Sequence, residues 1–356
     1  MKAQEFDYEL PERAIATVGM EPRDSARLLV DTAGRGDGTA EGLVDAVVGD
    51  LPDHLRAGDV FVVNDTRVLP ARVRFTRSTG GSGEVLFLTA IEDGWWDALV
   101  RPSAKLPPGT VVAVDDRFSL EFGADLGEGR RIVCPLVDGA PAAGSTLLDA
   151  LERVGEMPLP PYLGDAHLDD PDRYQTVFAN RPASAAAPTA GLHLTDALLD
   201  RIRAKGVQIA RVELVVGLGT FRPMTTDDVE DHVMHHESYR VPPTSWDAIE
   251  RARSESRRIV AVGTTVVRAL ESAAATGELA GSTDLFIRRP YDWQVVDVLM
   301  TNFHLPRSTL LVMIDAFVGP RWRDIYAAAL DRGYRFLSFG DAMLLERERS
   351  TESAST

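Results

Sequence analysis

Short apolar stretches separated by turn residues fill the chain between residues 60 and 136. Stretches of this length, rich in valine and aromatic residues and bounded by glycine, proline or serine, are typical of antiparallel strands. The strands predicted in this way cover residues 60–63, 71–75, 84–91, 95–101, 110–114, 118–122 and 130–136. So many short strands in succession predict a small β-barrel or sandwich.

Helical periodicity appears only after this region. Ser145 is a suitable N-cap for a helix whose apolar side chains recur through Val154 and which ends at Gly155. Downstream, strand-like apolar runs (207–216, 259–262, 284–287, 309–314 and 334–338) alternate with predicted helices (246–257, 266–275 and 322–330). This alternation predicts an α/β layer arrangement.

The predicted fold class is therefore α/β, with a larger α/β domain and an inserted small antiparallel β-barrel domain. The α/β domain is discontinuous and comprises residues 1–68 and 145–345, with residues 24–30 and 42–48 completing it. The barrel comprises residues 69–144. Residues 346–356 are polar and lack apolar periodicity, which predicts a disordered tail.

The chain of 356 residues has 44% hydrophobic residues and a formal net charge of -16, which describes a globular protein with a sizeable core. The acidity argues against indiscriminate binding to polyanions, which depends on lysine and arginine. Specific RNA binding through a local basic patch stays open, although a solvated face balanced by the surrounding acids is the more common explanation for either patch taken separately. The two patches comprise Arg67, Arg72, Arg74, Arg77, Arg101 and Lys105, and Arg251, Arg253, Arg257 and Arg258.

Cys134 is the only cysteine, which excludes an intramolecular disulfide and any multi-cysteine zinc site. Because it lies in the apolar run 132–134, we expect a buried strand residue and not a catalytic thiol. The N-terminus lacks the basic and then apolar order of a signal peptide, and no run approaches the length of a transmembrane helix. We therefore expect a cytoplasmic protein without a membrane partner.

The stretch from Ala186 to His193 places an imidazole at the end of a run of small residues. Small residues let the backbone approach a ligand, and a histidine there can move protons near neutral pH. Thr195 is a suitable N-cap for a helix with an apolar stripe through Ile202, which Gly206 closes. His193 then lies just before a helix N-terminus, where anions are stabilised. A hydrogen-bonded structural histidine in a tight turn is the alternative.

Polar side chains also follow strands of the predicted α/β part, where open sheets bind ligands. Gly263, Thr264 and Thr265 form a tight turn between strand 259–262 and a helix. Their amides and hydroxyls can hold a carboxylate or phosphate, with Arg268 one turn further, although a simple N-cap explains them too. Asn64, Asp65, Thr66 and Arg67 directly follow the apolar strand 60–63. Thr301, Asn302 and His304 precede another apolar run.

Two further patterns do not match the sites that they suggest. Gly217 and Gly219 resemble the start of a dinucleotide-binding loop, but the third glycine and the downstream acid are missing. His232, His235, His236 and Glu237 have the spacing of metal ligands, but the pattern matches neither zinc-protease signature. A hydrogen-bonded polar cluster is therefore expected there instead of a metal.

An ordered series of segments carries a family resemblance. The segments are 6–11, 23–25, 27–30, 64–68, 70–72, 159–162, 173–177, the stretch through His193, 217–221, the group His232, His235 and Glu237, 262–265 with Arg268, Glu271 and Ser272, 301–306 and 340–344. Over nearly its whole length the chain resembles the S-adenosylmethionine:tRNA ribosyltransferase-isomerases of queuosine synthesis. The resemblance implies a two-domain architecture, with an α/β domain and a β-barrel insertion.

The resemblance also implies a reaction. The ribose of S-adenosylmethionine is transferred to the 7-aminomethyl group of a 7-deazaguanine in the tRNA anticodon and rearranges to an epoxycyclopentanediol, while adenine and methionine leave. The sulfonium acidifies the ribose 5′ methylene, so a base removes a proton, and the departing adenine needs a proton donor. His193 and His304 are the predicted catalytic residues for these transfers, and the helix entrance at Gly263 to Thr265 is predicted to hold the methionine carboxylate.

We expect no metal and no cofactor, because S-adenosylmethionine is consumed as the ribosyl donor substrate. The expected partners are S-adenosylmethionine and tRNA carrying 7-aminomethyl-7-deazaguanine, and the expected state is a monomer. The predicted substrate-binding residues are Asn64, Asp65, Thr66, Arg67, Thr189, Gly191, Gly219, Thr220, His235, Glu237, Thr264, Thr265, Arg268 and Asn302.

Some positions depart from the family pattern, and they leave alternatives open. The departures are Leu194 for phenylalanine, Val215 for histidine, Arg289-Pro290 for Pro-Gly, and Asp315 for serine. One alternative is the same ribosyl-transfer chemistry on a small 7-deazapurine acceptor. The other is a non-catalytic RNA-binding protein that has kept the fold.

Overall fold

The computed structural model describes residues 1–32, 42–163, 170–216 and 223–348, and the chain divides into two compact units. Unit 1 comprises Met1–Thr66, Asp172–Arg181 and Ala187–Thr356. Unit 2 comprises Arg67–Pro171 and Pro182–Ala186, so it is longer than the predicted insertion of residues 69–144.

The longer boundary follows from α2 (Gly144–Val154). Its apolar side chains Leu147 and Leu151 are buried, and the helix packs against strands of unit 2. Directly after it, β12 (Gly155–Glu156) pairs with β5 (Arg72–Thr76). The predicted helix from Ser145 is therefore present, but it belongs with the inserted unit.

Unit 1 is built on a sheet of nine strands among the described residues, in the order β17-β15-β14-β3-β16-β18-β19-β1-β2. The strands β14, β3, β16 and β18 are mutually parallel, and β19 runs antiparallel to β18. Their bounds are β1 (Arg27–Asp31), β2 (Leu43–Val47), β3 (Val60–Asn64), β14 (Gln208–Leu214), β15 (Glu237–Arg240), β16 (Ile259–Val262), β17 (Ala280–Thr283), β18 (Val298–Asn302) and β19 (Ala342–Glu346).

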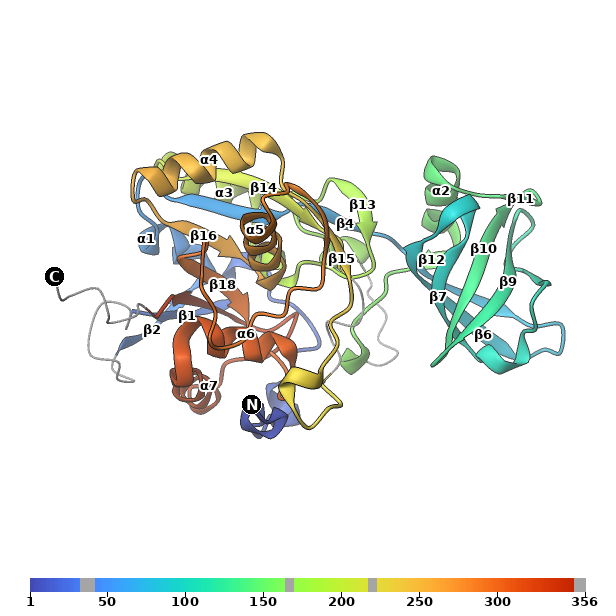
Figure 1. Ribbon diagram of the computed structural model, residues 1–356, viewed down its shortest axis with the longest axis horizontal. Coiled ribbons are helices and arrows are strands. Elements are labelled where there is room, and N and C mark those ends of the chain that lie inside the picture. Colours follow the sequence, from blue (N-terminus) through green and yellow to red (C-terminus); the bar gives the residue numbers. More distant parts are fainter. Residues whose placement is uncertain (33–41, 164–169, 217–222, 349–356) are drawn as a thin grey trace. The chain divides into compact units, whose positions relative to one another are not determined.

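Helices cover both faces of this sheet (Figure 1). Leu198 and Ile202 of α3 (Asp196–Ala204) share one buried core with Phe61 and Met300 of the sheet, and α1 (Leu51–His54) packs beside α3. The opposite face carries α4 (Pro243–Ser254), α5 (Thr264–Thr276) and α6 (Thr309–Val318). Right-handed crossovers require this arrangement, because the chain moves from β3 to β14 in one direction and returns past β3 to β16.

The reversal of direction creates a switch point between β3 and β16. The connections that leave the carboxyl ends of these two strands go to opposite sides of the sheet. Open α/β sheets bind ligands in the crevice at such a point. Asn64, Gly263 and Asn302 end or follow β3, β16 and β18. The fold therefore places these three residues at the edge of the sheet where a ligand is expected.

Some predicted elements differ from the structure. The run 309–314 is the start of α6 and not a strand, because a short run that is buried on all sides carries no periodicity to separate the two. Residues 284–287 follow β17, and 334–338 contribute an isolated bridge between Phe336 and Ile15. By contrast, the predicted N-cap is confirmed, since Thr195 Oγ1 accepts from Leu198 N at 3.1 Å.

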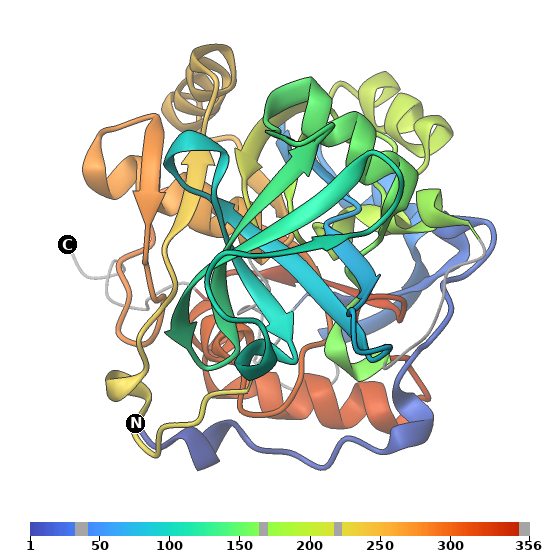
Figure 2. The same ribbon diagram turned by 90° about the vertical axis from the view of Figure 1, so that its right-hand side faces the viewer.

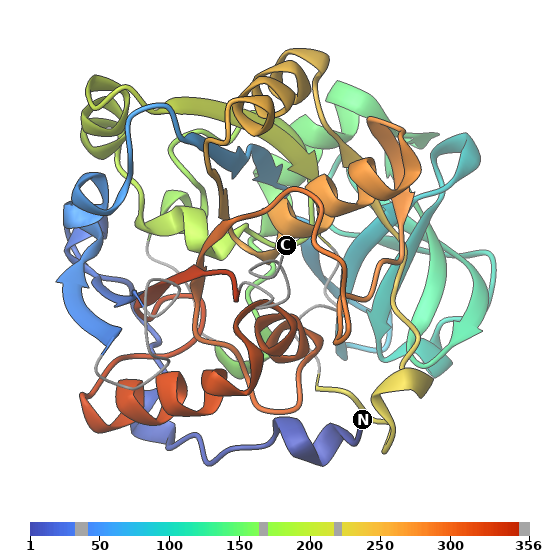
Figure 3. The ribbon, with the colours of Figure 1, turned by 60° about the vertical axis from the view of Figure 1, so that its left-hand side comes forward.

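Both ends of the described part of unit 1 make contacts with the rest of the unit. In Figures 1 and 3 the N-terminal segment runs beside α7 (Trp322–Asp331), where the rings of Tyr8 and Tyr326 lie 5.2 Å apart. At the other terminus, the predicted disordered tail begins too early. Glu346 belongs to β19 and Glu348 N donates to Phe317 O at 2.9 Å, while 349–356 lie outside the described residues.

Unit 2 is a curled antiparallel sheet of eight strands among the described residues, in the order β12-β5-β6-β7-β10-β9-β8, with β11 beside β10 (Figure 2). The additional bounds are β6 (Ser82–Ala90), β7 (Trp96–Arg101), β8 (Thr110–Ala113), β9 (Phe118–Gly127), β10 (Arg130–Val137) and β11 (Ala140–Pro141). The strands predicted between 71 and 136 are thus present, and Cys134 is buried. Two short strands, β4 (Thr66–Val68) and β13 (Arg181–Ser184), pair separately.

Within the described ranges, no helix has the length and apolar character needed to cross a bilayer.

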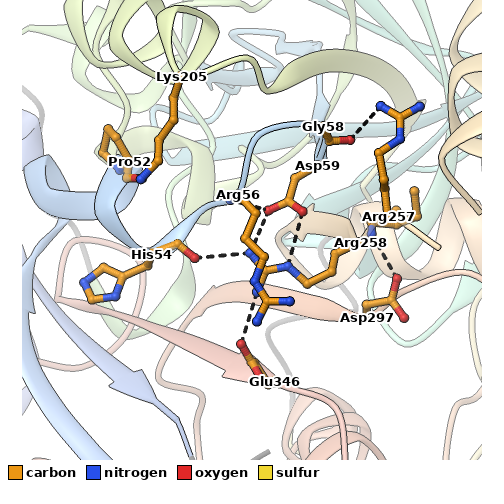
Figure 4. Close-up of polar contacts among 11 residues, drawn as sticks. Pro52, His54, Arg56, Gly58, Asp59, Lys205, Arg257, Arg258, Asp297 and Glu346 are labelled. Atoms are coloured by element: carbon orange, nitrogen blue, oxygen red, sulfur yellow. Dashed lines mark hydrogen bonds and ion pairs between the residues drawn. The ribbon is translucent and has the colours of Figure 1, made fainter. Parts of the chain in front are cut away.

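Arg258 links several segments at the amino edge of the unit 1 sheet (Figure 4). Its guanidinium donates to Asp59 Oδ2 at 2.6 Å, to Glu346 Oε1 at 3.1 Å and to the carbonyl of His54 at 3.2 Å. Asp59 is buried and also accepts from Arg56 N at 2.8 Å. One cation therefore connects the amino ends of β3 and β16 with the end of β19, opposite the switch point.

We predict that Arg258→Gln lowers the free energy of unfolding by about 3 kcal/mol, because Asp59 would remain buried without its counter-charge. Urea unfolding measures the change. Arg253→Gln is the matched control, since Arg253 pairs with Glu250 on the exposed side of α4 and should cost under about 1 kcal/mol. Equal losses in the two variants would contradict the assignment.

Candidate functional site

The side-chain amide of Asn64 joins three elements at the carboxyl end of β3. Its Nδ2 donates to Leu214 O at 3.0 Å and to Thr265 Oγ1 at 3.2 Å, and its Oδ1 accepts from Thr66 N at 3.1 Å. The ends of β3 and β14 and the start of α5 are thereby held together. A turn residue alone would not need these long-range partners.

A small pocket lies beside this amide, between β15, α5 and α6. Its polar lining includes Glu237, Thr264, Thr265 and Arg268, and its apolar lining includes Phe286 and Met313. The first turn of α5 leaves backbone N–H groups without intrahelical acceptors, which favours an anionic group there. The pocket thus combines a helix N-terminus with hydroxyl groups and apolar surface.

Arg268 and Glu237 form a buried ion pair in the wall of this pocket. Arg268 also donates to Leu285 O at 3.2 Å and to Thr283 O at 3.3 Å. Burial lowers the pKa of Arg268 to about 10, so the guanidinium stays charged at neutral pH. The donors of Arg268 are therefore used by Glu237 and by backbone carbonyls. The donors that the predicted anion site can offer are Thr264, Thr265 and the N-terminal N–H groups of α5.

Asn302 makes a second amide clamp at the end of β18. Its Oδ1 accepts from Thr189 Oγ1 at 3.0 Å, and its Nδ2 donates to Leu337 O at 3.2 Å and to Asp341 O at 3.4 Å. The same Nδ2 lies 2.9 Å from His193 Nε2. The turn Thr189–His193 and residues 337–341 are thus held against the strand end.

These bonds determine the protonation of His193. Because the Asn302 nitrogen is the donor, His193 Nε2 accepts and carries no proton. Burial, and to a smaller extent the charges of Arg335 and Arg173, lower the pKa of His193 to about 4. The ring is therefore neutral at pH 7 and bears its proton on Nδ1, which makes no hydrogen bond within the part of the chain that the structure describes.

His304 has a different environment. Its Nε2 lies 3.2 Å from Thr301 Oγ1, its backbone N donates to Tyr326 OH at 3.0 Å, and its carbonyl accepts from Tyr8 OH. Burial lowers the pKa of His304 to about 3, so this ring is neutral as well. The residue is integrated into the aromatic packing of α7 and the N-terminal segment.

The two histidines bond to the side chains of different residues of β18. His193 bonds to Asn302 and His304 bonds to Thr301, and adjacent residues of a strand direct their side chains to opposite faces of the sheet. Met300, on the same face as Asn302, packs in the α3 core. The use of both imidazoles at a single reaction centre stays a prediction.

Three other predicted site residues, Asp65, Gly191 and His235, have different environments. Asp65 is at the carboxyl edge, and burial raises its pKa, an effect that the charge of Arg211 partly offsets. Gly191 is small for packing reasons, because a Cβ there would lie 2.8 Å from the Phe178 ring and 2.9 Å from Thr176. His235 is exposed and does not line the pocket that Glu237 lines, since it precedes β15 on the surface.

Arg67 belongs to unit 2, so its place relative to this edge is not described. Gly219 and Thr220 lie outside the described residues. Within the described ranges, no group of histidine, cysteine and acidic side chains is arranged to hold a metal ion.

Reasoning from the sequence missed the arginines that surround His193. Arg23 and Arg173 line a small depression together with His193, and Arg335 acts on the same imidazole through its charge. These residues come from three distant segments. A search for local clusters of basic residues could not find them.

Three comparisons with known proteins bear on this site. A family model described as "Queuosine biosynthesis protein" matches residues 3–345. A relative from Thermus thermophilus, named S-adenosylmethionine:tRNA ribosyltransferase-isomerase, is 48% identical over 96% of this chain and 98% of its own length. A relative of the same name from Rubrobacter xylanophilus is 46% identical over 97% of this chain and 98% of its own.

Among solved structures, the S-adenosylmethionine tRNA ribosyltransferase from Thermotoga maritima is similar to this chain. It is 34% identical, with a TM-score of 0.54 over 96% of this chain and 99% of that one. Both the family model and the relatives cover nearly the whole length. The chain therefore belongs to the queuosine biosynthesis protein family.

Proposed function

We propose that this protein transfers the ribosyl group of S-adenosylmethionine to the 7-aminomethyl group of a 7-deazaguanine in tRNA and isomerises it. Adenine and methionine leave, and the product is epoxyqueuosine-tRNA. The observation that carries the proposal is the near full-length identity to relatives named for this reaction. The switch-point pocket supports it, because motif residues from distant segments meet there.

In this proposal the pocket beside α5 takes S-adenosylmethionine. Thr264, Thr265 and the N-terminus of α5 offer donors for the methionine carboxylate. The Glu237 carboxylate, balanced by Arg268, can face the sulfonium charge, while Phe286 and Met313 provide apolar surface for the adenine. No other cofactor is proposed, since the donor is consumed.

Removal of the proton from the ribose 5′ methylene needs a base that is free to accept it. His193 Nε2 already accepts from Asn302, and His304 is bonded to Thr301 within an aromatic cluster. We assign the role to Asp65, a buried carboxylate directly after β3 whose raised pKa makes it a better base; Asn180 donates to it, but a carboxylate has further lone pairs that can accept the proton. The proton that Asp65 gains is then available to the departing adenine. The predicted transfers by the two histidines stay predictions.

Two of the departures from the family pattern compensate each other. Asp315 is fully buried in α6, and Arg289 donates to both of its oxygens at 2.6 and 2.9 Å. Leu194 is buried in the α3 core. These substitutions therefore have local partners, and they give no reason to prefer a small 7-deazapurine acceptor over tRNA.

The proposal also covers the closure of the unit 2 sheet, the oligomeric state and the localisation of the protein. We infer that the unit 2 sheet closes as a barrel, because β5 contacts β8 from the other end of the sheet order and Phe75 packs 5.6 Å from Phe122. We also propose that the protein works as a monomer in the cytoplasm, where tRNA carrying 7-aminomethyl-7-deazaguanine is available.

The direct test measures adenine release from S-adenosylmethionine, with modified tRNA and the free 7-aminomethyl-7-deazaguanine base offered separately. We expect release with the modified tRNA only. Release with the free base would support the small-acceptor alternative and contradict the proposal. Absence of release with either acceptor would support the non-catalytic RNA-binding alternative.

We predict that Asp65→Asn lowers kcat for adenine release by about a hundredfold or more, the usual contribution of a positioned base. Binding of S-adenosylmethionine, measured by calorimetry, should change little. The acid limb of the wild-type pH profile should lie above the ordinary aspartate pKa of about 3.9, because burial raises the pKa of Asp65. The pH profile of Asp65→Asn should lack this acid limb, because the variant has no carboxylate at this position.

The matched control is Asp247→Asn, an exposed carboxylate on α4. It should retain wild-type kcat. An Asp65→Asn protein that folds normally and keeps wild-type kcat would remove Asp65 from the mechanism.

A further inference from the structure

One wall of the pocket beside α5 comes from a segment that has no helix or strand of its own. The segment comprises residues 284–297, which connect β17 to β18. Near its start, Leu285, Phe286 and Ile287 line the pocket. Because the backbone of such a segment is not held by a regular ladder of hydrogen bonds, its position depends on bonds to its neighbours.

The far end of the segment is bound by Glu271, a fully buried residue in the middle of α5. The Glu271 Oε1 accepts from the N–H groups of Val295 and Val296, and Oε2 accepts from the N–H group of Gln294, each at 3.0 Å. These three donors explain how an acidic side chain is buried at this place. Glu271 therefore fixes the end of the segment that leads into β18.

The near end of the segment is bound by α5 as well. Arg268, one turn before Glu271, donates to Leu285 O at 3.2 Å and to Thr283 O at 3.3 Å. Both ends of the segment are thus held by the helix whose N-terminus borders the pocket.

The middle of the segment is bound to α6 instead. Arg289 Nε donates to Asp315 Oδ2 at 2.6 Å, and Arg289 Nη2 donates to Asp315 Oδ1 at 2.9 Å, which is the strong paired geometry of an arginine and a carboxylate. The Asp315 side chain is buried, whereas that of Arg289 is 41% exposed. Trp293 adds a hydrogen bond from Nε1 to Ala316 O at 3.0 Å and packs its ring 4.9 Å from that of Phe317.

The Arg289–Asp315 ion pair lies close in sequence to both walls that it joins. Ile287, the last pocket-lining residue of the segment, precedes Arg289 by two positions, and Met313, the last one of α6, precedes Asp315 by two. Neither Arg289 nor Asp315 lines the pocket itself. The separation of the two walls therefore depends on a contact just outside the pocket.

We propose that the Arg289–Asp315 ion pair positions the apolar walls of the S-adenosylmethionine pocket and so determines how tightly the adenine is bound. The inference rests on the proposed function, which places the adenine against Phe286 and Met313. Apolar surfaces bind a ring only at contact distance, because a gap of about 1 Å forfeits up to half of the dispersion attraction. Arg289 and Asp315 are positioning residues, since they act through the walls and not on the donor.

The test uses a double variant, Arg289→Ala with Asp315→Ser, which removes the ion pair without leaving a buried carboxylate unpaired. We expect the KM for S-adenosylmethionine to rise about tenfold and kcat at saturating tRNA to stay within about twofold, because the lost contacts stabilise ground state and transition state alike. The inhibition constant of adenine, measured as a product inhibitor, should rise by the same factor as the KM. That of methionine should stay within about twofold, since its carboxylate is placed at the start of α5.

The matched control is a second arginine paired with a buried carboxylate. Arg321 donates to the buried Asp31, and neither residue lines the pocket. The single variants Arg321→Gln and Arg289→Gln each leave a buried carboxylate without its counter-charge, so both should lower the midpoint of urea unfolding. Only Arg289→Gln should raise the KM for S-adenosylmethionine. Arg289→Lys should give a KM between those of the wild type and Arg289→Gln, because the charge remains but the paired donors do not.

The outcomes separate this inference from the proposed function. If the wild-type enzyme releases adenine with modified tRNA but the folded double variant keeps the wild-type KM and adenine inhibition constant, the inference is wrong and the proposed function stands. Equal rises in KM in Arg289→Gln and Arg321→Gln, or equal rises in the inhibition constants of adenine and methionine, would also overturn it. If the wild-type enzyme releases no adenine with modified tRNA, the proposed function fails and the inference fails with it.

Discussion

The side-chain amide of Asn302 is the constraint on which the His193 side of the site depends. A strand end leaves backbone and side-chain polar groups that burial would penalise unless they are paired. Asn302 pairs four of them by joining Thr189, His193 and the carbonyls of Leu337 and Asp341. Three segments far apart in the sequence are thereby held in one geometry, and the tautomer of His193 follows from the orientation of one amide.

Asn64 has the corresponding role on the opposite face of the sheet, where it links β3 and β14 to Thr265. The switch point is thus bounded by two amides, one beside α5 and one beside the turn Thr189–His193. The α5 face offers a helix N-terminus and the Glu237–Arg268 ion pair, and the other face carries the depression that His193 lines with Arg23 and Arg173.

The parts of the fold and the site that could be predicted are those with local causes. Alternating strands, the N-cap at Thr195 and the polar residues directly after apolar strands, such as Asn64 and Asn302, have signals within a few residues. The run 309–314 was misread because a buried helix and a buried strand have the same composition. Segments 23–25 and 173–177 belong to the family series, but the approach of Arg23, Arg173 and Arg335 to His193 could not be predicted, since only tertiary packing brings these segments together.

The most direct test of this account measures the protonation of His193 by ¹⁵N NMR of histidine-labelled protein. The chain has seven histidines, so the His193→Gln variant assigns the signal. The account predicts a neutral ring at pH 7 with the proton on Nδ1, because Asn302 donates to Nε2. A ring that is protonated on Nε2, or one that titrates near 6.5, would contradict it.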